Sequence, residues 1–211
     1  MASAPDGQIV QKVVGWAAFT AESSYRFEDS FVARDLALTH VYGIAEETVT
    51  DSTVFLSPKV AHLYAWWRSC ARSDPDGAAL AANAPLRLPL RREFDIADHA
   101  QIVPDLFLVE VLPSGEFLMK LEGERVIDLF GINNTGRIIT EGTEGDYGHA
   151  LAEYYRGIVE ERLCRRCVGN LEQVDDRRWI EFESIDCPLS RDGRQVDFIL
   201  GISVGVREKR L

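Results

Sequence analysis

The sequence predicts an α+β fold in which an antiparallel sheet carries helices on one face. Two runs of strands, over about 106–122 and 164–206, are each joined internally by hairpin-length turns. Between them lies one long connection with helical periodicity, over about 124–163. Short turns make neighbouring strands antiparallel, and the connecting helices must bury their apolar sides against the sheet. We therefore expect a five-stranded sheet, preceded by a helical N-terminal extension.

The first hairpin has a well-defined register. In the strand over 106–111, Phe107 and Val109 are apolar and would face the core, whereas Glu110 would face water. A short turn at 113–116 leads into a second strand, 117–122, in which apolar and charged residues alternate again. Shifting either strand by one residue would turn its apolar side to water, so the alternation fixes the pairing.

The long connection contains two predicted helices. The first spans about 124–130 and stops at Gly131, a common residue at helix ends, before a turn cluster at 133–136. The second spans about 149–163 and has an apolar face at helical spacing. Gly157 inside it costs stability relative to alanine and indicates a close contact with another segment.

The remaining strands are predicted over about 164–173, 177–187 and 196–206. Turn residues at 175–176 and 191–194 separate them, and both connections have hairpin length. The last strand alternates large apolar residues with glycine, serine and aspartate. These three strands would complete the antiparallel sheet.

Upstream of the sheet, the strongest pattern is an amphipathic helix over about 58–72. Ser57 is an N-cap residue followed by proline, and apolar residues recur after it at helical spacing. A linker with several prolines follows. Before the helix, apolar residues over about 9–17 fall at helical spacing, whereas residues 20–56 give no clean period. The predicted organisation is a helical extension over 1–56, the helix and linker over 57–92, and the sheet domain over 93–211.

The overall charge argues against nucleic-acid binding. The chain has 34 acidic and 23 basic residues among 211, for a net charge of −11. Phosphate backbones are bound mainly through Lys and Arg, so we expect no nucleic-acid partner. The N-terminus lacks a signal-peptide pattern, and no apolar run is long enough to span a membrane. We expect a cytoplasmic protein with reduced cysteines.

Five segments occur in the order found in a known family. Through these segments the chain resembles the PAS sensor-domain superfamily, and in particular a bacterial family of small stand-alone PAS proteins. The resemblance covers roughly 58–206 and implies a sensing, dimerising or regulatory module rather than an enzyme. The segments are Leu63–Arg68, Arg92–Ile96, Val103–Leu108, Phe130–Arg137 and Pro188–Gly193.

The resemblance implies that a ligand would lie in the hollow between sheet and helices. Such sites are mostly apolar with a few polar groups, and Arg137 would pair with an anionic ligand. The alternative is that these are ordinary core residues and that Arg137 forms a surface salt bridge. No particular ligand or cofactor follows from the residues. The candidate lining residues are Phe107, Val109, Phe130, Arg137, Tyr147, Tyr155, Phe182 and Ser184.

Particular residues decide for or against two cofactors, a photochemically active flavin and haem. A flavin photosensor of this superfamily needs a cysteine on the helix after the second strand, and the segment 124–137 contains none. That photochemistry is excluded, whereas simple flavin binding is not. A haem sensor needs an axial ligand, and His149 at the start of the second helix is in a suitable place. The alternative is an exposed or capping histidine.

Cys164 and Cys167 raise a further alternative, a redox sensor. Their spacing is typical of redox and metal motifs, but residues three apart on a strand point to opposite faces. We therefore expect structural cysteines. Arg165 and Arg166 would nevertheless lower the pKa of a thiol that lay close to them.

No catalytic pattern stands out in the sequence. The glycine-rich segment 142–148 lacks the lysine of a phosphate-binding loop. We expect a protein without catalytic activity that binds a small molecule or a downstream signalling protein. The alternative is a ligand-free adaptor, because the helix over 58–72 carries two tryptophans, which are enriched at interfaces. We expect this helix to cover the outer sheet face, to form a homodimer, or both.

Overall fold

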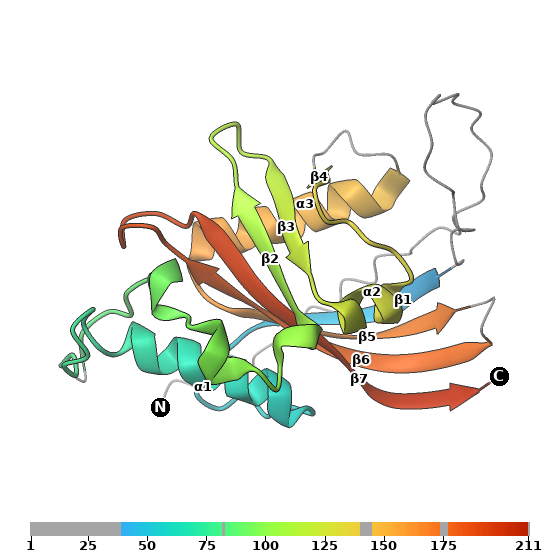
Figure 1. The fold of residues 1–211 in the computed structure, drawn as a ribbon, viewed down its shortest axis with the longest axis horizontal. Helices are drawn as coiled ribbons and strands as arrows, with labels where there is room; N and C mark the ends of the chain where they lie inside the picture. Colours follow the sequence, from blue (N-terminus) through green and yellow to red (C-terminus); the bar gives the residue numbers. More distant parts are fainter. Residues whose placement is uncertain (1–38, 82, 140–144, 174–176, 211) are drawn as a thin grey trace, which may run out of the picture.

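A computed structural model describes residues 39–81, 83–139, 145–173 and 177–210. Within these residues the strands form one seven-stranded sheet in the order β1-β5-β6-β7-β2-β3-β4 (Figure 1). Every neighbouring pair is antiparallel, as predicted. The predicted count of five strands is wrong, because β1 and β4 extend the sheet at its two edges. The strands are β1 (Thr39–Thr48), β2 (Leu106–Val111), β3 (Phe117–Glu122), β4 (Ile138–Ile139), β5 (Arg165–Gln173), β6 (Arg178–Leu189) and β7 (Phe198–Arg210).

Strand β1 corrects the prediction of a helical extension over 1–56. Thr39–Thr48 is a strand that pairs antiparallel with β5, and the pairing shifts register between Tyr42 and Ala45. Gly43 lies in this bulge with a φ of 62°, a conformation that glycine adopts without the strain of a side chain. The rest of the predicted extension, residues 1–38, lies outside the described residues.

The first two helices begin and end near their predicted limits, whereas the third begins at Gly145, four residues before its predicted start. The Ser57 side chain caps α1 by accepting a hydrogen bond from the N–H of Lys59 at 3.3 Å. Gly131 ends α2 in the left-handed region, with a φ of 71°. Within the described residues, no helix is long and apolar enough to cross a membrane. The helices are α1 (Pro58–Ala71), α2 (Glu124–Phe130) and α3 (Gly145–Glu161), with short 3₁₀ turns η1 (Arg91–Glu93), η2 (Ile96–His99) and η3 (Val103–Asp105).

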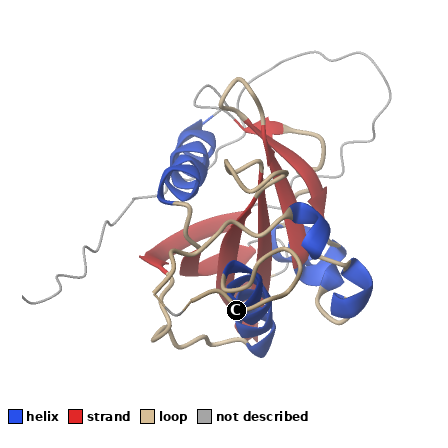
Figure 2. Cartoon of the chain, turned by 90° about the vertical axis from the view of Figure 1, so that its left-hand side faces the viewer, coloured by secondary structure: helices blue, strands red, loops and turns tan. Residues whose placement is uncertain are grey.

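Helices cover both faces of the sheet (Figures 1 and 2). The helices of the long connection, α2 and α3, lie on one face as predicted, which we call the inner face. Helix α1 covers the opposite, outer face, which was one of the alternatives for it. The alternation of β7 shows the division, because Leu200 and Ile202 pack in the cluster of α1 whereas Ile199 packs in the cluster of α3.

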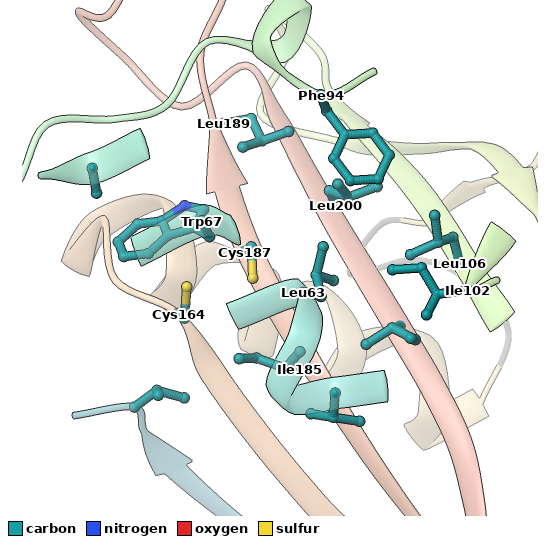
Figure 3. Close-up of a cluster of buried hydrophobic side chains, with 14 residues drawn as sticks. Leu63, Trp67, Phe94, Ile102, Leu106, Cys164, Ile185, Cys187, Leu189 and Leu200 are labelled. Atoms are coloured by element: carbon teal, nitrogen blue, oxygen red, sulfur yellow. The ribbon is translucent and has the colours of Figure 1, made fainter. Parts of the chain in front are cut away.

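The outer face and α1 enclose a large apolar cluster (Figure 3). Leu63 and Trp67 of α1 are completely or almost completely buried against Ile185 and Cys187 of β6. The indole N–H of Trp67 donates to the carbonyl of Pro188 at 2.8 Å, so its polar atom is satisfied. Burying a side chain of this kind stabilises the fold by about 1.5–3 kcal/mol.

A buried carboxylate fixes the start of α1 to the sheet. Glu183 of β6 is fully buried and accepts hydrogen bonds from the N–H groups of Leu56, at 3.0 Å, and Ser57, at 2.6 Å. The Nε of Arg166 donates to the same carboxylate at 2.6 Å. A buried charge is costly unless it is paired and hydrogen-bonded, and Glu183 meets both conditions.

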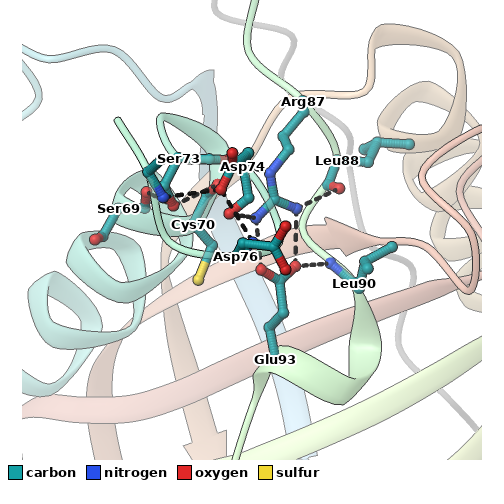
Figure 4. Close-up of polar contacts among 10 residues, drawn as sticks. Ser69, Cys70, Ser73, Asp74, Asp76, Arg87, Leu88, Leu90 and Glu93 are labelled. Carbon is teal, nitrogen blue, oxygen red and sulfur yellow. Dashed lines mark hydrogen bonds and ion pairs between the residues drawn. The ribbon is translucent and has the colours of Figure 1, made fainter. Parts of the chain in front are cut away.

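The linker after α1 is held by a second ion pair (Figure 4). Arg87 binds Glu93 through two parallel hydrogen bonds, of 2.5 and 2.8 Å, and also donates to the carbonyl of Ser73. Glu93 accepts a further hydrogen bond from the N–H of Leu90 at 2.5 Å. Bidentate pairs of this kind fix orientation as well as distance. They join the end of α1 to the segment that leads into the sheet.

Candidate functional site

Aromatic rings lie close against glycines of the inner sheet face. A Cβ atom added to Gly201 of β7 would fall 2.0 Å from the ring of Phe107, and one added to Gly169 of β5 would fall 2.8 Å from the ring of Phe182. Both distances are far shorter than real contacts, so only glycine leaves space for the rings there. The glycines of these strands therefore shape the layer between the sheet and the helices.

The predicted lining residues do meet in this layer. Phe107, Val109, Tyr155, Phe182 and Ser184 are all buried. The ring of Phe182 contacts the ring of the half-buried Phe130, with 5.6 Å between centroids, and Tyr155 contacts Phe117 at 5.4 Å. Their side chains pack against one another as core residues do. The prediction that they bind a ligand stays a prediction.

The other candidate residues lie elsewhere. Arg137 is exposed between α2 and β4, and its carbonyl accepts the N–H of Met119. His149 is exposed in the first turns of α3, so it does not join the buried layer. Tyr147 belongs to α3, but its side chain lies outside the described residues. An anion-binding role for Arg137 and a haem-binding role for His149 are therefore not supported by burial.

A buried polar pair lies at the centre of the same layer. The hydroxyl of Tyr154 on α3 donates to Oδ2 of Asp186 on β6 at 2.8 Å, and Asp186 is 2% exposed. Burial raises the pKa of Asp186 to about 7, against the lowering effect of the Tyr154 hydrogen bond, and nearby Glu46 raises it further. Oδ1 of Asp186 has no hydrogen-bond partner within the described residues.

Two further polar side chains border this pair. Cys167 of β5 lies opposite Ser184 of β6 in the sheet and packs in the same cluster as Tyr154. Burial raises the pKa of Cys167, and the carboxyl of Asp186 adds to the effect. Burial raises the pKa of Tyr154 in the same way. The cluster therefore presents neutral hydrogen-bonding groups beside one carboxyl group that titrates near neutral pH.

Asp186 was missing from the predicted site, although the sequence contained a signal for it. Phe182 and Ser184 were predicted to face the hollow, and side chains two apart on a strand share a face. The same alternation places Asp186 on the inner face, next along the strand. An aspartate at a core-facing position of a central strand is uncommon, so it marks a special environment.

The cysteines are placed as predicted, but the electrostatic reason for a redox role is wrong. Cys164 packs in the outer cluster and Cys167 in the inner one, on opposite faces. The pKa of Cys164 is raised by burial and by its neighbour Cys187. Arg165 and Arg166 do not lower it, because their guanidinium groups pair with glutamates. Protonated, buried thiols are poor targets for oxidation.

The similarity to a known structure is weak. A solved structure of an RNA-binding light-oxygen-voltage receptor matches with 13% identity and a TM-score of 0.37. The match covers 60% of this chain, and the chain spans only 37% of the length of that receptor. No curated protein matches the chain.

The sequence itself matches a family model more extensively. That model is described as the PAS domain, and it matches residues 56–204. The match begins just before α1 and ends within β7, so it includes α1, α2 and α3 and the strands β2 to β6 but not β1. The resemblance noted from five short segments is thereby confirmed, and the chain belongs to the PAS domain family.

Proposed function

We propose that the protein is a cytoplasmic PAS-type sensor that holds a small molecule between the inner sheet face and α3. The observation that supports this proposal most is Asp186, whose Oδ1 lacks a partner within the described residues while Tyr154 holds Oδ2. Buried polar atoms are nearly always hydrogen-bonded, so an unpaired carboxyl oxygen is an expected attachment point for a ligand or a water molecule.

The chemistry of the cluster indicates the class of ligand. Tyr154, which holds Asp186, packs in an apolar cluster with Tyr155 and Ile158 of α3. A few convergent polar groups in an apolar layer are typical of small-molecule sites. In its charged form the carboxylate of Asp186 only accepts hydrogen bonds, so a ligand that binds this form should present a donor such as a protonated amine or a ring N–H. Tyr154 and Cys167 keep their protons at neutral pH, which favours recognition over nucleophilic catalysis.

Analysis of molecules released from the protein tests the proposal. The freshly purified protein would be denatured, and the released small molecules would be identified by mass spectrometry. We expect one donor-bearing compound in a fixed ratio to protein, and a strong reduction of it in Asp186→Asn. Asp197→Asn is the matched control, because Asp197 is also buried but lies in the turn region before β7. Equal amounts in all three proteins would refute the role of Asp186.

A second function, a ligand-free adaptor, is favoured by a different observation. The rings of Phe107 and Phe182 already fill the space above Gly201 and Gly169. A PAS domain filled in this way would pass signals through packing alone. In that case the released fraction would contain no compound in fixed ratio to the protein.

Homodimerisation near α1 remains part of the proposal. Val54 and Leu56, just before α1, are 81% and 53% exposed, which is high for large apolar side chains. Exposed apolar side chains that cluster together often mark an interface. Light scattering should give the mass of a dimer, and a monomer at all concentrations would contradict this part. Val54→Asp should shift the equilibrium toward the monomer.

The absence of nucleic-acid binding is likewise proposed. Several of the arginines that cluster in sequence are engaged by carboxylates, as Arg87 is by Glu93 and Arg166 is by Glu47 and Glu183. Paired guanidinium groups are less available to phosphates. A gel-shift experiment with single-stranded RNA should show no complex at low salt, and a salt-sensitive complex would contradict the proposal.

A further inference from the structure

Strand β7 is longer than the strand beside it. It runs from Phe198 to Arg210, but β2 pairs with it only as far as Ile202, the partner of Leu106. The chain before Leu106 forms the turn η3 and leaves the sheet. Residues 203–210 pair with β6 on one side, and no other described strand pairs with them on the other. This part of β7 is an open sheet edge.

The register shows where hydrogen-bonding groups point along this edge. The N–H of Gly123 donates to the carbonyl of Leu106, so Leu106 is directed toward β3. Residues alternate in direction along an antiparallel strand, so Phe107 is directed toward its partner Gly201 in β7. The same alternation directs the N–H and C=O groups of Ser203 and Gly205 to that side, beyond the end of β2. An unpaired edge of this kind is a template for another strand.

A groove of about 420 Å³ lies alongside the open edge. Residues Ser203–Glu208 of β7 form one wall, and Arg125, Asp128 and Leu129 of α2 belong to the other. Gly205 is exposed, so no side chain of its own blocks the edge there. A sheet edge facing a helix across a groove is the arrangement in which an extended peptide can add a strand.

The two ends of the groove differ in charge. Next to Ser203, Asp105 is 3% exposed and binds both Lys59, at 2.6 Å, and Arg125, at 3.1 Å. Two cations share one carboxylate there, which leaves a surplus positive charge.

Next to Glu208 the balance is reversed. Arg178 lies 2.9 Å from Glu208 and 3.9 Å from Asp128. Arg207, which also lines the groove, lies 3.3 Å from Glu181. Two cations therefore face three carboxylates. A bound segment would therefore place a negative group beside Arg125 and a positive group beside Glu208.

From this geometry, we propose that the groove binds the extended C-terminal segment of a partner protein as an added strand antiparallel to β7. Such a strand would run in line with β2 and in the same direction. Its carboxyl end would reach the Lys59 and Arg125 cations, where Leu106 and β2 block any continuation. The edge from Ser203 to Glu208 contains a bulge and lies opposite five residues of β6. It spans about 13 Å at ~3.3 Å per residue, enough for a segment of about five or six residues.

The proposal goes beyond the proposed function and does not depend on the site at Asp186. A partner segment that fits would carry a basic residue near its start, apolar residues along the groove and a free carboxylate at its end. The basic residue would meet Glu208 and Asp128, and the carboxylate would meet Arg125. A segment in the opposite direction would bring its terminal amine to the cationic end, which is unfavourable.

An oriented peptide library tests the proposal directly. Hexapeptides with lysine at the first position, randomised positions after it and a free carboxylate would be selected on the full chain and identified by mass spectrometry. A selected peptide with a fluorescent label would then be measured by fluorescence polarisation. We expect selection from this library, and binding at least about tenfold weaker when the carboxylate is amidated, as expected for the loss of a charge-assisted hydrogen bond. No selection, or equal binding of the amide, would overturn the proposal.

Paired variants separate the edge from the charges. Gly205→Pro removes the N–H at the open edge and should weaken binding at least about tenfold, whereas Gly205→Ala keeps the N–H and should bind better than Gly205→Pro. Arg125→Glu should weaken binding, whereas Arg92→Glu, an exposed arginine outside the groove, should not. Circular dichroism melts establish that each variant folds. If Gly205→Pro does not fold, unchanged binding by Arg125→Glu is enough to refute the proposal.

Discussion

The substitution Asp186→Asn should change how the stability of the protein depends on pH. Folding raises the pKa of Asp186 from 3.8 to about 7, mainly through burial. Between these values the unfolded chain carries the charged carboxylate, while the folded protein must hold a proton. The folded state therefore binds more protons, and its stability falls as the pH rises through this window. About three pKa units at ~1.4 kcal/mol each give a total on the order of 4 kcal/mol.

The difference in the free energy of unfolding between the wild type and Asp186→Asn isolates the contribution of the Asp186 carboxyl group. Urea denaturation of the wild type and of Asp186→Asn, from pH 4.5 to 8, gives the free energy of unfolding of each. The variant should gain stability relative to the wild type by about 1.4 kcal/mol per pH unit up to about pH 7, and the difference should then level off. A difference that stays flat, or that falls with rising pH, would refute the account of Asp186 as a buried, proton-binding group.

Asp197→Asn is the matched control for this measurement. Burial alone would raise the pKa of Asp197, but hydrogen bonds from the Arg191 N–H, Gln195 and Ser190 outweigh it, so the pKa is lowered. A lowered pKa gives stability above the ordinary value of 3.8 that is lost as the pH falls below it. The difference between Asp197→Asn and the wild type should therefore stay level over the window in which the Asp186→Asn difference rises.

Three further substitutions test the packing, each by urea denaturation. Leu63→Ala deletes a completely buried side chain beneath α1 and should cost about 2–5 kcal/mol; a loss below 1 kcal/mol would mean that α1 is not packed on the outer face. Gly201→Ala adds a methyl group that clashes with the ring of Phe107, so it should lower the free energy of unfolding by about 1–3 kcal/mol. An unchanged stability would contradict the position of the ring. Ser57→Ala removes the cap of α1 and should cost about 1 kcal/mol, whereas Thr53→Ser, outside the helix, should not.

The parts of the fold that follow local rules could be predicted from the sequence. The hairpin of β2 and β3 has clean alternation on both sides of a turn, so its pairing was fixed by side-chain direction. Helix α1 has a serine cap and an apolar stripe, and the structure uses both. Gly157 was predicted to make a close contact, and the guanidinium of Arg165 lies against it.

Strand β1 could not be predicted, and its geometry explains why. It is an edge strand whose residues are mostly exposed, so burial imposes little pattern on its sequence. The bulge at Gly43 also shifts the alternation halfway along the strand. The alternation of apolar and polar residues that identifies a strand is therefore too short in β1 to be recognised. Its position is set by pairing with β5, more than a hundred residues later in the chain, which a local pattern does not contain.

Some residues of the candidate site could likewise be predicted from the sequence, and others could not. Phe107, Phe182 and Ser184 were predicted to face the hollow, because alternation along a strand determines the face. The role of Asp186 could not be predicted in this way, because it depends on the residue that lies opposite it on the helix. That residue is Tyr154 of α3. The exposed position of Arg137 depends on the path of the loop after α2, for which the sequence has turn residues but no periodic pattern.

Native mass spectrometry of the freshly purified protein tests the central claim most directly. It reports any retained small molecule and the number of subunits in one measurement. The account predicts a retained mass in fixed ratio to the subunits, which disappears in Asp186→Asn while the variant stays folded. A folded wild-type protein with no mass beyond its own chain would contradict the claim that the inner layer holds a ligand.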